Sequence, residues 1–176
     1  MKSKIVRFLC TFLVIMFGYF LQNGLFSSLL FLQTIPNVLL FLTVTYGFLR
    51  GPYVGIVTGA FCGFLCDVSG GTLIGFYALI YLYLGWFSGM FNRFFYLDEI
   101  VLPLILCGIC DFIYGCYVYL FRIFLHGNFN FPLYLQKIIL PEVVYTIVIA
   151  IVLYRMVLFL HNKCDELEKR SARKFV

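Results

Sequence analysis

GPYVGIVTGAFCGFLCDVSGGTLIG, residues 51–75, carries a glycine at every fourth position of its first half, at Gly51, Gly55, Gly59 and Gly63. Residues four apart share one face of a helix, so these glycines form a stripe that has no side chains. In water, each glycine inside a helix would cost roughly 0.5–1 kcal/mol. In a bilayer, small residues at this spacing let a neighbouring helix backbone come close. The stretch therefore predicts a tightly packed membrane helix, and a soluble glycine-rich loop is the less favoured alternative.

The composition of the whole chain also indicates a membrane protein. The 176 residues are 63% hydrophobic and 12% charged, whereas soluble domains carry about 25% charged residues. A chain this short exposes much of its surface, so its excess of apolar side chains must face lipid. We predict an all-α polytopic membrane protein with about six transmembrane helices. Residues 1–162 would form the six-span domain and residues 163–176 a charged cytoplasmic tail.

The spans are expected where apolar runs approach the roughly 20 residues that cross a bilayer. The second and third runs are only about 14 residues, or roughly 21 Å, which requires a thinner bilayer or helices extended by their flanks. Residues 25–32 would form an interfacial helix or extend the second span, and residues 67–72 would form a turn. The six expected spans are residues 5–21, 36–49, 53–66, 73–91, 100–125 and 139–160.

Basic residues predict the orientation, because lysine and arginine gather on the cytoplasmic side. With six spans, both termini share one side, and the other side has only Arg122 and Lys137 near its span ends. We therefore expect a multi-pass plasma-membrane protein with both termini in the cytoplasm. The formal charge of +5 then reflects contact with anionic lipid, and no nucleic-acid partner is needed to explain it. The basic residues on the side of the termini are Lys2, Lys4, Arg7, Arg50, Arg93, Lys163, Lys169, Arg170, Arg173 and Lys174.

Asp111 is the clearest ionisable residue inside an expected span, where such groups are costly and often functional. Gly108 and Gly115 lie on its helix face, so another helix could press against the carboxyl group. The site could hold a proton or a ligand. The favoured alternative is a hydrogen bond between helices, to a tyrosine or threonine.

Asp67, Arg122 and Glu142 are expected at the outer ends of their spans, with Glu142 near a helix N-terminus after Pro141. An Arg122–Glu142 pair with Asp67 nearby would form a structural clasp. The chain shows no nucleophile–base pair, phosphate loop or metal-binding motif, so we predict no enzymatic activity, cofactor or metal. A second pair of small residues, Gly85 and Gly89, could face the glycine stripe.

The order of these motifs resembles the family of the rod shape-determining protein MreD over nearly the whole chain. The resemblance implies a non-enzymatic membrane scaffold of the bacterial cell-wall elongation machinery. It also implies binding to the bitopic protein MreC, in a group with MreB, RodA and the partner transpeptidase of RodA. The residues that carry it are PN at 36–37, LRG at 49–51, the glycine ladder to Asp67, LIGFYAL at 73–79, YLG at 83–85, Asp111, LPE at 140–142 and YT at 145–146.

The MreD family is also similar in fold to the substrate-binding subunits of energy-coupling-factor vitamin transporters. A transport subunit is therefore the alternative function. Those subunits present an Ala-x-x-x-Ala type patch on their first span to the partner that energises them. The first expected span here, residues 5–21, contains no alanine, which counts against transport.

Overall fold

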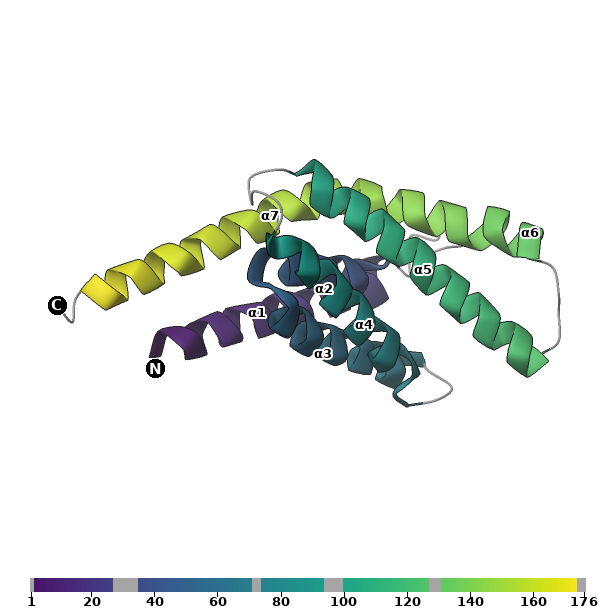
Figure 1. Ribbon diagram of the computed structural model, residues 1–176, viewed down its shortest axis with the longest axis horizontal. Helices are drawn as coiled ribbons and strands as arrows, with labels where there is room; N and C mark the ends of the chain where they lie inside the picture. The colour runs from purple at the N-terminus through teal and green to yellow at the C-terminus, as the bar shows by residue number, and fades with distance from the viewer. Residues whose placement is uncertain (1, 27–34, 71–73, 94–99, 127–130, 174–176) are drawn as a thin grey trace.

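The computed structural model describes residues 2–26, 35–70, 74–93, 100–126 and 131–173, which form helices and no strand (Figure 1). For some of these residues, near the helix ends, only the backbone is described. The elements in chain order are α1 (Lys2–Phe20), the π-helical η1 (Leu21–Phe26), α2 (Val38–Arg50), α3 (Pro52–Gly70), α4 (Phe76–Met90), the short 3₁₀ turn η2 (Phe91–Arg93), α5 (Val101–His126), α6 (Phe131–Tyr134), the π-helical η3 (Leu135–Ile139) and α7 (Leu140–Arg173).

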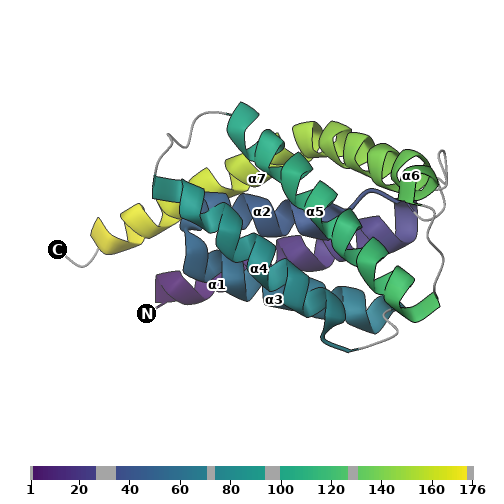
Figure 2. The same cartoon turned by 45° about the vertical axis from the view of Figure 1, so that its right-hand side comes forward.

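The long helices run along one common direction and alternate in sense. In Figures 1 and 2, α1, α3 and α5 run one way and α2, α4 and α7 run the other. Both chain termini consequently lie at the same end of the bundle. Near the opposite end, the side chain of Asn23 in η1 donates a hydrogen bond to Ser69 near the end of α3, at 3.4 Å.

Helix α2 is the centre of the bundle, since residues 38–49 are all buried. Two side chains satisfy its first N–H groups: Asn37 Oδ1 accepts from Leu40 at 3.3 Å, and Gln22 Oε1 accepts from Leu39 at 3.0 Å. Because protein surrounds this helix, its short length of 13 residues need not match the thickness of the hydrocarbon.

Helices α3 and α4 pack against α2, and α1, α5 and α7 complete the bundle (Figure 2). Aromatic rings join α4 to α5: Phe76 stacks on Tyr117 with centroids 4.8 Å apart, and Tyr81 meets Tyr114 edge-on at 5.7 Å. Helix α1 is tied to the C-terminal end of α2, where Arg50 Nη1 donates to Thr11 Oγ1 at 2.8 Å.

Three helices in the described part of the chain are long and apolar enough to cross a membrane: Pro52–Gly70, Val101–Phe121 and Phe131–Leu160. Three further apolar helices are shorter: Phe8–Gly24, Val38–Arg50 and Phe76–Met90. All six correspond in position to the spans expected from the sequence. Residues 27–32 of the expected interfacial helix lie outside the described residues.

Helix α3 has 19 residues and continues to Gly70, so flanking residues extend the short third run, and its expected end at residue 66 was wrong. The expected turn at residues 67–72 therefore begins later. Two polar side chains that suggested a turn have partners compatible with a helix. Ser69 Oγ donates to the carbonyl oxygen of Leu65 at 2.7 Å, and Asp67 binds the start of the next helix.

The last helical segment starts earlier and ends later than expected. It is continuous from Phe131 through the π-helical η3 into α7, and it reaches Arg173. Pro141 has no N–H group to donate, and the π-helical turn before it accommodates this loss within one helical run. Residues 163–173, expected as a charged tail, continue the helix of α7.

Candidate functional site: a glycine seam and two polar clusters

Glycines join α3 to α4 at backbone contact. A Cβ added at Gly55 would overlap the carbonyl oxygen of Gly85 and lie 2.7 Å from its carbonyl carbon. The reverse also holds, because a Cβ at Gly85 would overlap the carbonyl oxygen of Gly55. Real Cβ atoms essentially never approach another heavy atom within 3.0 Å. At this point, therefore, only two glycines allow the two helices to pack at the observed distance.

The contact extends along both helices in antiparallel order. A Cβ at Gly59 would lie 2.8 Å from the carbonyl carbon of Tyr81, and one at Gly63 would lie 2.7 Å from the backbone nitrogen of Ala78. A Cβ at Gly89 would meet the backbone of Pro52. The sequence suggested that Gly85 and Gly89 could face the stripe, and in the structure α4 fills it. We call Gly55, Gly59, Gly63, Gly85 and Gly89 the glycine seam.

Gly51 has a different role from the other glycines of the ladder. It lies before α3, as the C-cap of α2, with φ of +92°, a conformation that side chains other than glycine rarely adopt. Its N–H group donates to the carbonyl oxygen of Gly47 at 2.8 Å. Gly51 therefore forms the tight connection between α2 and α3.

Asp67, the next residue in the glycine stride, binds the start of α4. Its carboxylate is 3% exposed and accepts backbone hydrogen bonds from Gly75 at 2.9 Å, Tyr77 at 2.9 Å and Ala78 at 3.2 Å. Gly75 is the N-cap of α4 and has no side chain that could serve these N–H groups. Asp67 of α3 supplies this cap, and its negative charge also suits a helix N-terminus.

A second polar cluster surrounds the start of α2. The backbone N–H of Asn37 donates to Thr146 Oγ1 of α7 at 3.1 Å, and the hydroxyl of Tyr81 in α4 donates to Asn37 Oδ1 at 2.5 Å. Asp111 of α5 faces the same place, since Thr146 and Asn37 are the polar side chains that interact with its carboxyl group. The cluster thus joins four helices inside the bundle.

The carboxyl group of Asp111 is 1% exposed, and neither oxygen has a well-formed hydrogen bond among the described residues. Glu142 of α7 interacts electrostatically with it. Glu142 lies in the first turn of α7, but that turn continues η3, so it is not at a free helix end as the sequence suggested. Asp67 binds α4, and the proposed Arg122–Glu142 pair depends on the Arg122 side chain, which lies outside the described residues.

Asp111→Asn is expected to preserve the fold better than Asp111→Leu. Asparagine still offers an oxygen and polar hydrogens to Thr146 and Asn37, whereas leucine leaves those polar neighbours without a counterpart, at a cost of roughly 1–3 kcal/mol. The measurement is the unfolding temperature of the purified variants, together with cell shape. If Asp111→Asn stays inserted and stable but abolishes rod shape, the residue has a role in proton chemistry rather than in packing.

Sequence reasoning missed three residues of these clusters. A Cβ at Gly47 would overlap Ser88 Oγ and lie 2.7 Å from the carbonyl oxygen of Gly85, so α2 also packs closely on α4. Gly47 lies four residues before Gly51, so the four-residue spacing of the glycines, continued toward the N-terminus, includes it. Tyr81 gave no such signal, and Asn37 stood out only in the PN motif at residues 36–37; the tertiary packing brings the two side chains together.

In the described residues, the fold and its polar clusters define a small helical membrane protein in which Asp67, Asn37, Tyr81 and Thr146 form hydrogen bonds between elements. Residues 2–164 match the family model of rod shape-determining protein MreD. The chain belongs to the MreD family, a structural family that determines cell shape, and this membership assigns it a role in rod shape determination. Comparisons with curated proteins and with solved structures found no match.

Proposed function

We propose that this protein is a non-enzymatic scaffold of the bacterial cell-wall elongation machinery, which maintains rod shape by binding MreC. In this proposal it also belongs to a larger group with MreB, RodA and the transpeptidase partner of RodA. The match to the MreD family over residues 2–164 carries the proposal. In this proposal MreC binds outward-facing sides of the bundle, since α4 occupies the glycine seam.

The alternative, a substrate-binding subunit of an energy-coupling-factor type vitamin transporter, requires small residues on the first helix for its energising partner. The outward side of α1 instead carries large side chains, and this observation favours the scaffold over the transporter. The large exposed residues of α1 are Phe8, Leu9, Phe12, Leu13, Phe17 and Phe20.

Affinity purification after mild detergent extraction separates the two functions. We expect MreC to copurify with the tagged protein, and to be absent when the tag is moved to an unrelated membrane protein. Recovery of an ATPase module in place of MreC would contradict the scaffold and support transport.

The proposed topology has six spans in the plasma membrane and both termini in the cytoplasm. Two structural observations support it: the helices alternate in sense, and both termini lie at one end of the bundle (Figure 1). Reporter fusions at Gly24, Ser69 and Gly127 are expected to be external, and a fusion at Asn92 internal. The pairing of Asn23 with Ser69 agrees with this assignment, as does the hydrogen bond from Asn92 to the carbonyl oxygen of Phe48 at the other end. A cytoplasmic Ser69 would contradict the topology.

A further inference from the structure

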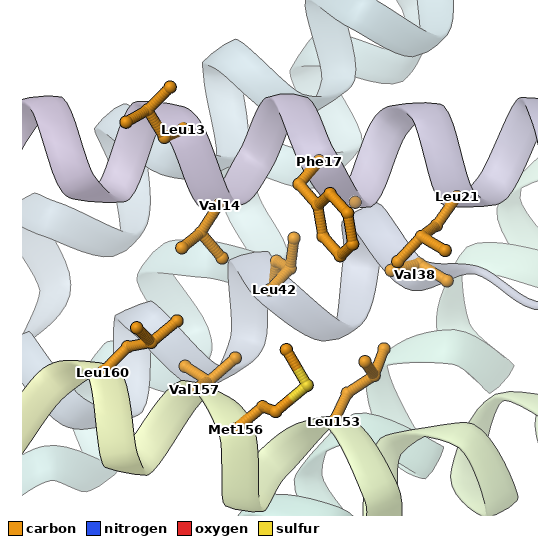
Figure 3. Close-up of a pocket in the computed structure, with 11 residues that line it drawn as sticks. Leu13, Val14, Phe17, Leu21, Val38, Leu42, Leu153, Met156, Val157 and Leu160 are labelled. Carbon is orange, nitrogen blue, oxygen red and sulfur yellow. The ribbon is translucent and has the colours of Figure 1, made fainter.

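An apolar groove lies between α1, α2 and α7. It encloses about 200 Å³, and side chains of α1 and α7 face each other across it (Figure 3). Its floor is buried, at Val38, Leu42 and Val157, while Leu13 and Phe17 on its rim are more than half exposed. The groove is therefore open along one side, to the solvent that surrounds the bundle. In a membrane that solvent is lipid.

One end of the groove reaches a basic side chain. A second cavity of about 160 Å³ continues it, with Leu13, Val14 and Leu160 lining both. The second cavity adds Arg50 and Thr11. The groove thus combines a long apolar section with a cationic end.

The position of Arg50 fixes the charge at that end. Its guanidinium group donates to Thr11 at 2.8 Å and lies 5.4 Å from the centre of the Tyr46 ring. These two contacts hold the cation at the groove. Arg50 ends α2, at the end of the bundle where both chain termini lie (Figure 2). The exposed Lys163 adds a second positive charge three residues after Leu160.

We propose that this groove binds one anionic phospholipid, with an acyl chain between α1 and α7 and the phosphate group at Arg50. The charge of Arg50 complements a phosphate, and the apolar section complements a hydrocarbon chain. The lipid would come from the leaflet on the side of the chain termini.

Lipid binding to the purified full-length protein, measured by native mass spectrometry, tests this proposal. The probes are phosphatidylglycerol and phosphatidylcholine with identical acyl chains. We expect phosphatidylglycerol to bind about fivefold more tightly, the effect of one favourable basic contact. Arg50→Gln should abolish this preference, and Arg50→Lys should retain it. Arg155→Gln is the matched control, since it removes an exposed positive charge of α7 that does not line the groove.

A second variant tests the acyl-chain section. Val14→Trp, on the wall shared by both cavities, should weaken binding of both lipids to a similar extent because it fills the groove. In the unsubstituted protein, added salt should reduce the preference for phosphatidylglycerol, which gives a readout that needs no variant. Equal binding of the two lipids would overturn the proposal. Cross-linking of Met156→Cys to a second copy or to another protein's helix in native membranes would also overturn it.

Discussion

Gly59→Leu is expected to lower the stability of the purified protein by about 3 kcal/mol or more, in the absence of any partner. Gly59 lies in the middle of the glycine seam, where even a Cβ would come within 2.8 Å of the Tyr81 carbonyl carbon. That neighbour is backbone and cannot rotate away, so α3 and α4 must separate and lose their packing. Thermal unfolding in detergent measures the effect, and loss of rod shape should accompany it in cells.

Gly70→Leu is the matched control for this experiment. Gly70 ends the same helix, and a Cβ there would meet nothing within 4 Å. Its substitution should change stability by no more than about 0.5 kcal/mol, as is usual at exposed positions. If Gly59→Leu keeps full stability but loses MreC in copurification, the seam is a docking site for MreC and the helix packing described above is wrong.

Asp67→Ala is expected to have the second largest effect, lowering the free energy of unfolding by about 3 kcal/mol. The substitution removes the acceptor of three backbone N–H groups at the start of α4, and each donor left unpaired costs roughly 1–3 kcal/mol if it stays buried. Asp67→Asn should lose less, because one side-chain oxygen remains as an acceptor.

Ser69→Ala provides the comparison for Asp67→Ala within the same helical turn. The Ser69 hydroxyl is exposed, and it pairs with the carbonyl oxygen of Leu65 in its own helix, with the Tyr19 hydroxyl at 2.9 Å and with Asn23 at 3.4 Å. Because these hydrogen bonds are exposed to the surroundings, we expect their removal to change stability by no more than about 1 kcal/mol. An effect of Asp67→Ala no larger than that of Ser69→Ala would show that the carboxylate does not cap α4.

The use of the glycine stride for packing could be predicted from the sequence, because the period of the helix alone puts Gly55, Gly59 and Gly63 on one face. The role of Asp67 on the same face could not be predicted. It depends on α4 folding back antiparallel, so that Gly75 and Tyr77 meet the carboxylate. From the sequence alone, Asp67 therefore looked like the first residue of a turn after the third span.

The polar cluster at the start of α2 could also be predicted only in part, because its residues lie far apart in the chain. Asp111 could be identified as an interior polar residue, because a single carboxyl group stands out in an apolar span. Its neighbours could not be identified, since Asn37 and Thr146 are 109 residues apart in the chain. Helix α2 likewise looked too short for a membrane, and only the packing of other helices around it explains its length.

A double-mutant cycle on Gly55→Ala and Gly85→Ala tests the central claim, that α3 and α4 of one chain meet backbone to backbone. The free energy of unfolding of the purified protein is measured for both single variants and for the double variant. Each new Cβ pushes the same two helices apart, so the double variant should lose less than the sum of the singles, by about 1 kcal/mol or more. Gly55→Ala combined with Gly108→Ala, which shares no close neighbour with Gly55, should be additive. Single variants with unchanged stability, or strictly additive losses for Gly55 and Gly85, would contradict the account.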